Sequence, residues 1–434
     1  MGTDQQQVLL LGLSVIAGVT IAKFLARVFA PRDPRVHGPA ANASQVAAAW
    51  RAVESLDLEG KLFNDELAIA LAGGKAFSEA MAAAQPYRHK SASRLCSIST
   101  VAARTWWIDR AILTALTTPA VPGTRGWLSA RLTGSARGPS SPPRQLVLLG
   151  AGMDSRAWRL PLPLNGLKVF EVDRQDVLVT KKRALQRAGA EVPGEGGVAQ
   201  YQLRCESWTA VPSSFFFFQT DDNDDNNDND KNDDNNMVPT DTSHNEMLLL
   251  EALQSNGFDP AAPSVWVLDA VVMFLGDAAV RRLLRTLFEA SGPGSTLIGG
   301  GVTEEGAGDA QQLVANYENS KSSSTRDRGR NYRCYPLSSI KAWRSTIPLD
   351  PGPLLAEGGW VLHETATLPS IGKQICSNMS GSNGNGSSNG NSGSRTSGNG
   401  HSHSYGGSFL DGTCDFDDDF LGEVLFIARK PATA

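Results

Sequence analysis

Residues 145–152 read QLVLLGAG, and residues 168–173 read KVFEVD. Consecutive apolar residues that run into a Gly-x-Gly turn are typical of a buried parallel strand followed by a tight turn, where glycine lets a ligand approach the backbone. The second stretch indicates another strand, and it ends in an acid. An acid about 20 residues after such a turn can bind two ribose hydroxyls. The two stretches therefore predict a nucleoside site that includes Gly150, Gly152 and Asp173.

The residues after the turn indicate which nucleoside is bound. A dinucleotide fingerprint would place its third glycine at position 155, where this chain has Ser155. A pyrophosphate favours a helix N-terminus without negative charge, but Asp154 lies at that point. An acid there suits a cationic sulfonium ligand, so the sequence favours S-adenosyl-L-methionine as the cofactor. An NAD-dependent oxidoreductase is the less favoured alternative, and no GxxxxGK stretch followed by Ser or Thr occurs to form a P-loop.

Strands and helices alternate after the turn, which predicts a mostly parallel α/β sheet. Before the turn, residues 44–132 have apolar positions three and four apart and predict helices. Lys181 and Lys182, in a helix predicted over 177–185, are expected on its solvated face. The stretches that indicate strands are 145–152, 168–173, 198–203, 264–268, 295–299, 360–365 and 423–428.

Two low-complexity stretches interrupt this pattern. Residues 219–236 are almost wholly Asp and Asn, and residues 377–408 are almost wholly Ser, Gly and Asn. They predict disordered inserts over 213–243 and 377–410. Most of the acidic excess behind the formal net charge of −5 lies in the first insert, so the folded part is near neutral, which argues against a nucleic-acid partner. The five cysteines are scattered without CxxC spacing, and the sequence predicts no metal site.

The N-terminal residues suggest a membrane anchor. Residues 8–22 contain no charge, and the apolar run reaches Ala30 if Lys23 and Arg27 snorkel to the interface. Every nearby Lys or Arg follows the run, which predicts a single span over 8–30 with the catalytic body in the cytosol. Residues 1–43 would then form the anchor and its linker. The alternatives are an organellar targeting segment and a cytoplasmic protein.

Three stretches resemble the leucine carboxyl methyltransferase family in its broad sense: LVLLGAGMDSRAWRLP (146–161), VFEVDRQDVLVTKKRAL (169–185) and SVWVLDAVVMFLGDAAVRRLLRTL (264–287). The resemblance implies S-adenosyl-L-methionine as cofactor and a class I methyltransferase-like Rossmann fold with a mostly parallel seven-stranded sheet. The methyltransferase domain would cover 44–434. Within it, a helical cap would span 44–135 and a Rossmann-like core 144–430.

The resemblance also implies roles at the methionine end of the cofactor. Arg104 lies in ARTWWIDRAI (103–112), which is similar to a family segment whose arginine holds the methionine carboxylate. Gly150 and Gly152 would line the methionine half, and Asp154 would lie near its amino group.

The other implied roles lie at the nucleoside end, where this chain departs from the family pattern. Asp173 would hold the ribose. Gln202 and Leu203 stand where the family has an Asp-Leu pair near the adenine, and Asp269 stands where it has Glu. Phe274 replaces an aromatic residue that is commonly Tyr. These departures leave the acceptor open.

The implied reaction is methyl transfer to an oxygen. A carboxylate acceptor needs no general base, whereas an alcohol or phenol needs one. No histidine is obviously placed for that role, since His363 lies on a late strand and His244 at the end of an insert. The sequence therefore favours a carboxylate or acidic hydroxyl of a small molecule, and it identifies no catalytic residue. The alternatives are a protein's C-terminal leucine carboxylate and a catalytically silent nucleoside-binding protein tethered to a membrane.

Overall fold

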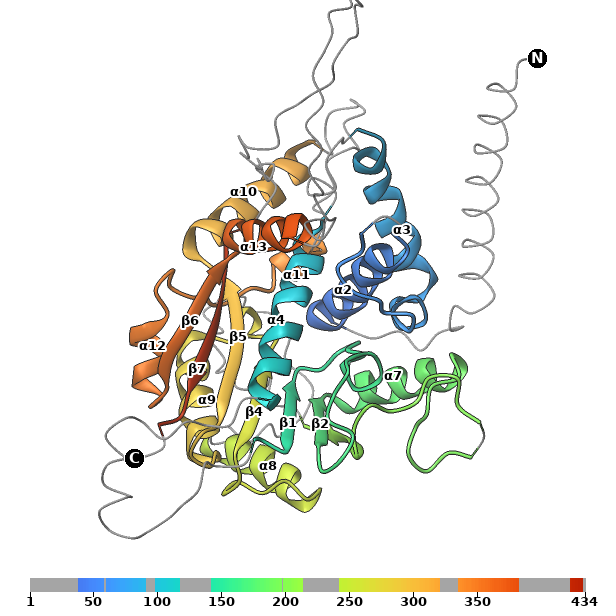
Figure 1. Cartoon of the computed structure of the whole chain (residues 1–434). Helices are drawn as coiled ribbons and strands as arrows, with labels where there is room; N and C mark the ends of the chain where they lie inside the picture. The colour runs from blue at the N-terminus through green and yellow to red at the C-terminus, as the bar shows by residue number, and fades with distance from the viewer. Residues whose placement is uncertain are drawn as a thin grey trace, which may run out of the picture.

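The computed structural model describes residues 38–57, 60–90, 98–117, 142–196, 198–213, 242–320, 335–381 and 422–431. Their centre is a seven-stranded sheet with the order β3-β2-β1-β4-β5-β7-β6 (Figure 1). Strands β1 to β5 run parallel, and β7 is antiparallel to both of its neighbours. The strands are β1 Gln145–Leu149, β2 Lys168–Asp173, β3 Ser207–Pro212, β4 Ser264–Leu268, β5 Thr296–Val302, β6 Val361–Thr367 and β7 Glu423–Arg429.

Helices cover both faces of this sheet, because apolar side chains of the central strands point alternately to each side. Leu146 and Leu148 of β1 join one core, whereas Val147 and Leu149 join the other. The described helical elements are α2 Pro39–Ser55, α3 Ala68–Lys90, α4 Thr100–Thr117, α6 Arg156–Arg159, α7 Gln175–Arg187, α8 Thr242–Ser255, η3 Val272–Phe274, α9 Asp277–Glu289, α10 Glu304–Ser320, α11 Leu337–Ile340, α12 Gly352–Glu357 and α13 Leu368–Gly381.

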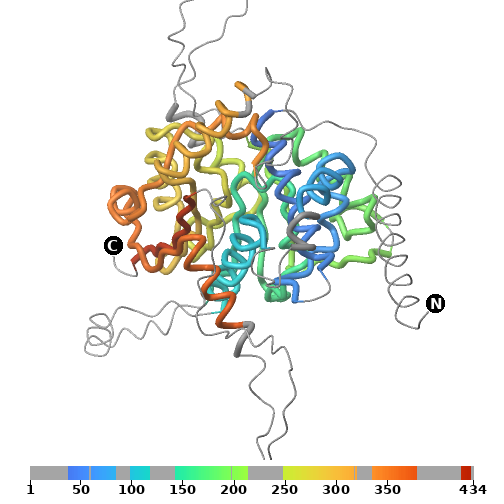
Figure 2. The backbone as a smooth tube through the Cα atoms, turned by 90° about the horizontal axis from the view of Figure 1, so that it is seen from above, coloured from blue at the N-terminus to red at the C-terminus, as the bar shows by residue number. Residues whose placement is uncertain are grey.

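The two cores have different helical partners. Helices α2, α3, α4, α7, α10 and α13 contribute buried residues to the first core, and α8, α9 and α12 contribute to the second. Seen from above, α4 lies between the N-terminal helices α2 and α3 and the C-terminal strands (Figure 2). The class I methyltransferase-like fold with a seven-stranded, mostly parallel sheet and an N-terminal helical cap is thus confirmed.

The N-terminal cap begins earlier than the sequence indicated. Residues 39–43, predicted as the end of a linker, form the first turn of α2. Pro39 suits this place, because its fixed φ fits a helix and its missing N–H would have no helical partner there. The Ala-rich sequence that follows then propagates the helix.

The third strand is also displaced from its predicted position. Residues 198–203 were expected to form it, but β3 is Ser207–Pro212, which pairs with β2 from Lys168 to Asp173. Tyr201 makes only an isolated bridge to Ala190. The reason is packing: Trp208 and Val211 of β3 are buried, whereas Val198 is fully exposed. Apolar pattern alone did not distinguish these neighbouring stretches.

Lys181 corrects another expectation. The side chain of Lys182 is 41% exposed, as expected, but that of Lys181 is fully buried and its Nζ lies 2.5 Å from Glu171 Oε2. Glu171 lies within β2 on the face that α7 covers, and a buried carboxylate needs a counter-charge. Burial raises the pKa of Glu171 to about 7, although Lys181 acts in the opposite direction.

Predicted insert boundaries overlap parts of the described chain. Within the insert predicted over 213–243, Ser213 donates its N–H to the backbone carbonyl of Asp173, and α8 begins at Thr242. Helix α13 runs through the first residues of the insert predicted over 377–410. The remaining residues of both predicted inserts lie outside the described ranges.

The predicted membrane location is corrected. The proposed span over 8–30 lies outside the described residues, and no helix of the described chain has the length and apolar character to cross a membrane. A span needs about 20 predominantly apolar residues, and the described helices of such length, α3 and α4, carry charges such as Lys75 and Asp109. We therefore retain neither the membrane location nor the membrane-tethered alternative.

Candidate active site

A pocket of about 400 Å³ lies at the carboxyl ends of β1, β2 and β4. In open parallel sheets, ligands bind at this edge. The pocket is of the size usual for small-molecule sites. Six of the eight residues predicted to bind the cofactor line it: Arg104, Gly150, Gly152, Asp154, Asp173 and Asp269. The fold therefore brings together side chains that are separated by up to 165 positions in sequence.

The glycine turn is tied directly to the tip of β2. Gly150 and Gly152 have φ angles of +65° and +48°, which favour glycine. The N–H of Gly152 donates to Asp173 Oδ2 at 2.7 Å, and the N–H of Arg174 donates to Oδ1 at 2.7 Å. Burial raises the pKa of Asp173, although these two N–H groups favour its ionised form. Asp173 thus fixes the turn as well as facing the pocket.

Arg156 connects the charged side chains of the site, and no role was predicted for it from the sequence. Its side chain is 2% exposed and reaches three acids from different elements. Its nitrogens lie 2.5 Å from Asp154 Oδ2, 2.7 Å from Asp109 Oδ1 and 2.9 Å from Asp269 Oδ2. The only available signal was its place in GMDSRAW, directly after the glycine turn.

These ion pairs determine the protonation of the pocket's acids. Burial alone would raise the pKa of Asp154, but the nearby cations, above all Arg156, together outweigh burial and hold that pKa well below the usual range. The pKa of Asp269 is lowered for the same reason, by Arg156 and Arg104 against burial. Asp154 is therefore ionised but already paired with Arg156. The sequence favoured an acid here beside a cationic sulfonium ligand, and the structure adds that this acid already has a cationic partner.

Arg104 lies on α4 and joins the site to the last strand. Its Nη1 donates to Tyr335 Oη at 2.7 Å and lies 3.1 Å from Glu423 Oε2, and its Nε donates to Asp269 Oδ1 at 3.0 Å. Among the described residues, Nη2 has no hydrogen-bond partner, so it can still bind a ligand carboxylate. The sequence did not identify Tyr335 or Glu423, because neither lies near a recognised motif.

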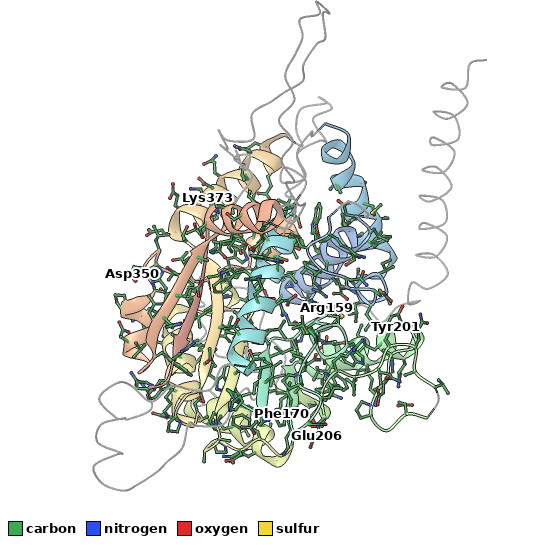
Figure 3. The ribbon with its side chains drawn as sticks, in the orientation of Figure 1. Arg159, Phe170, Tyr201, Glu206, Asp350 and Lys373 are labelled. Carbon is green, nitrogen blue, oxygen red and sulfur yellow. The ribbon has the colours of Figure 1, made fainter. Side chains whose placement is uncertain are left out.

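Helix α2 forms one wall of the pocket, and the sequence did not predict this role. A Cβ built on Gly152 would lie 2.5 Å from the Cβ of Ser44, so the helix packs directly on the glycine turn. Arg51 Nη2 donates to the carbonyl of Met153 at 2.5 Å, while its Nε lies 2.8 Å from Asp65. Arg159 of α6, labelled in Figure 3, lies 3.6 Å from Asp65 in the same loop after α2.

Gln202 and Leu203 do not line the pocket. They precede β3, whereas the prediction placed them after the third strand. The backbone N–H of Leu203 instead donates to Glu191 at 3.0 Å. Their contact with an adenine ring stays a prediction. Their place outside the described pocket lining does not favour it. Phe274, the expected aromatic residue after β4, does line the pocket.

Ala270 is strained beside the pocket. It follows Asp269 and has a φ of +53°, and among the described residues no other non-glycine residue has a positive φ. This conformation costs an alanine about 1–2 kcal/mol. Such strain gathers at functional sites, where the surrounding structure holds it. Here it directs the chain from β4 into η3 while Asp269 keeps its contacts with both arginines.

The ionised acids predict how stability responds to low pH. A carboxyl with a lowered pKa in the folded state stabilises above its unfolded value, 3.8 for Asp154, and loses that contribution as the pH falls through its folded value. We expect the melting temperature of the wild type to exceed that of Asp154→Asn at pH 6, with the gap closing below about pH 4.

Circular dichroism melts from pH 2 to 7 check this prediction. The difference between variants is the readout, because Asp173 and Glu171 have raised pKa values and shift stability in the opposite direction. Asp309→Asn, at an exposed position inside α10, is the control and should give no gap. A gap for Asp154→Asn that stays constant down to pH 2 would contradict the pairing.

The pocket's central residues, from Gly150 to Asp269, come from a single stretch of the chain, and the comparisons with known proteins match this stretch. Residues 136–288 match the leucine carboxyl methyltransferase family. The resemblance found in the sequence is confirmed. The family segment includes β1 to β4 and most of α9, and it does not include the cap helices or β5 to β7.

Relatives of known sequence align with parts of the chain. A Mycolicibacterium smegmatis protein named "Putative S-adenosyl-L-methionine-dependent methyltransferase" is 30% identical over 153 residues, 35% of this chain and 36% of that protein. A Mycobacterium sp. (strain JLS) protein with this name is 27% identical over 242 residues, 55% and 63% of the two chains. The matches therefore span less than two thirds of these relatives. A solved duf574 family protein from Streptomyces avermitilis is 13% identical, with a TM-score of 0.42 over 89% of this chain and 97% of its own.

Proposed function

We propose that this protein is an S-adenosyl-L-methionine-dependent methyltransferase that methylates a carboxylate or an acidic hydroxyl of a small molecule. The observation that carries the proposal is the glycine turn hydrogen-bonded to Asp173 at the carboxyl edge of the sheet. This pair lies inside the segment that matches the methyltransferase family. The names of the relatives support the same cofactor.

The residues of the pocket fit this cofactor. Arg104 Nη2 would bind the methionine carboxylate, and the backbone at Gly150 and Gly152 would line the methionine half. Asp173 would accept hydrogen bonds from the ribose hydroxyls. Asp269, whose side chain is 25% exposed toward the pocket, would face the nucleoside half.

The charge of the surrounding network also favours a cationic ligand. The connected ion pairs contain the arginines 51, 104, 156 and 159, and the acids Asp65, Asp109, Asp154, Asp269 and Glu423. With all groups ionised, the network carries one negative charge in excess. A ligand with one net positive charge would balance it in a buried setting, where charges interact strongly.

Methyl transfer to a carboxylate needs the methyl group and the acceptor oxygen to be held close together, and it needs no general base. When bound, the cofactor supplies a methyl group whose bond to the sulfonium sulfur breaks as a bond to the acceptor oxygen forms, leaving a thioether. Holding the two groups in near-attack geometry can supply about 7–11 kcal/mol of the barrier. No histidine lines the described pocket, and His363 lies on the edge strand β6. A carboxylate acceptor, which has no proton to remove, fits this lining.

The test is the binding of S-adenosylhomocysteine by the Asp173→Ala variant. Because the charged Asp173 carboxylate would accept two hydrogen bonds from the ribose, we expect the Kd for S-adenosylhomocysteine to rise by about 100-fold. Calorimetry measures this, with NAD as the competing ligand. Asp309→Ala, at an exposed position on α10 outside the pocket, is the control and should bind normally. An unchanged Kd in Asp173→Ala would remove the ribose assignment, and binding of NAD alone would overturn the proposed function.

A protein's C-terminal leucine carboxylate is the alternative acceptor, and the description of the matched family supports it. The two acceptors share a carboxylate but differ in size. Incubation with a labelled methyl donor separates them. A small-molecule extract and a peptide ending in leucine would be offered side by side, and the product that carries the label identifies the acceptor class.

A further inference from the structure

Arg344 lies at the rim of the pocket, and backbone contacts hold its segment in place. It is exposed, and it lines the same pocket as the glycine turn. Its backbone N–H donates to the carbonyl of Met273 at 2.8 Å. The next residue, Ser345, donates its hydroxyl to the carbonyl of Val272 at 3.0 Å. Arg344 is thereby fixed to η3, the turn that follows Asp269.

The charge of Arg344 is unpaired within the part of the chain that the structure describes. Every other arginine in the described lining of the pocket has an acid partner: Arg51 with Asp65, Arg104 with Glu423, Arg156 with Asp154, and Arg174 with Asp176. No ion pair joins Arg344 to an acid of the described chain. Arginine binds carboxylates with two parallel hydrogen bonds, so an arginine without a partner at a pocket rim can bind an anionic ligand group.

The surroundings of Arg344 are apolar. Ala342, Phe274 and Val101 contribute to the same pocket, from the segment of Arg344, from η3 and from α4. Trp343 is buried and stacks edge-on against Tyr335, with ring centroids 5.2 Å apart, which holds the segment in place. A cation beside an apolar wall suits a molecule with a hydrocarbon body and one anionic group.

We propose that Arg344 determines acceptor specificity by binding the anionic group of an amphipathic carboxylic acid. This inference rests on the proposed methyltransferase function and narrows its acceptor class. Arg344 selects the acceptor and has no part in binding the methyl donor, which the residues around Gly152 and Asp173 would hold. The two assignments are therefore separable by experiment.

The experiment uses three matched probe pairs: hexanoate, decanoate and 4-phenylbutanoate, each beside its primary amide. The full chain is first saturated with S-adenosylhomocysteine, whose Kd is measured in the same calorimeter. Each probe is then titrated into the wild type, Arg344→Gln, Arg344→Lys and Arg285→Gln. Arg285 is an exposed arginine of α9 outside the pocket, so it controls for loss of one surface charge.

We expect at least one acid to bind the wild type and Arg285→Gln about tenfold more tightly than its amide, the effect of one charge-assisted contact of about 1.4 kcal/mol. Arg344→Gln should lose this preference with an unchanged Kd for S-adenosylhomocysteine, and Arg344→Lys should keep part of it. The inference is overturned if the wild type does not prefer any acid, or if Arg344→Gln keeps the preference. If the wild type does not bind S-adenosylhomocysteine, the result would instead count against the proposed function.

Discussion

Replacing Arg156 by alanine is expected to lower the free energy of unfolding by about 3–5 kcal/mol, the usual cost of removing one partner of a buried ion pair. The effect is large because Arg156 faces Asp109, Asp154 and Asp269 at once, and its loss leaves these carboxylates near one another with less compensation. We also expect S-adenosylhomocysteine binding to be lost, since the glycine turn and Asp269 would separate. Denaturant unfolding and calorimetry measure the two effects.

Two further variants test whether Arg156 acts through its charge alone. Arg156→Lys keeps the charge but cannot reach three acids with a planar fork, so we expect an intermediate loss of stability. It also keeps the prediction testable if Arg156→Ala does not fold. Arg285→Ala, at an exposed position on α9, should change stability by less than about 0.5 kcal/mol. A similarly small change in Arg156→Ala would show that the buried network does not stabilise the fold.

The second large effect is expected for Gly152→Ala. The new Cβ would lie 2.5 Å from Ser44 Cβ, and the φ of +48° is unfavourable for alanine. Backbone strain of about 1–2 kcal/mol and overpacking of about 1–3 kcal/mol together predict a loss of about 2–5 kcal/mol. Because α2 would be displaced from the turn, the Kd for S-adenosylhomocysteine should rise as well.

A matched glycine separates the two causes. Gly194 has a φ of +84°, and a Cβ there would meet nothing within 4 Å. Gly194→Ala should therefore show the backbone term alone, about 1–2 kcal/mol. Adding Ser44→Gly to Gly152→Ala should restore part of the lost stability, because it removes the atom that clashes. If Gly152→Ala and Gly194→Ala lose equal stability, α2 does not pack on the turn as the structure shows.

Much of the fold could be predicted because its signals are local. The strands predicted at 168–173 and 264–268 match β2 and β4 residue for residue, and the glycine turn follows β1 as expected. A continuous apolar run is buried on both faces wherever helices cover a parallel sheet. The apolar pattern was insufficient at β3, because two adjacent stretches could pair with β2. The stretch that does pair is the one whose Trp208 is buried in the folded protein.

The sequence by itself determined the parallel sheet, the glycine turn and the place of Asp173, because these follow from apolar runs and from residues a fixed distance apart. Only the tertiary structure decided which charges neutralise one another. Arg156 meets Asp109 and Asp269 across 47 and 113 positions, and no periodicity records such a contact. The packing of α2 on Gly152 and the absence of an ion pair at Arg344 among the described residues were decided in the same way. Buried charge must be compensated in space, so the partner is chosen by the folded arrangement and not by neighbours in the chain.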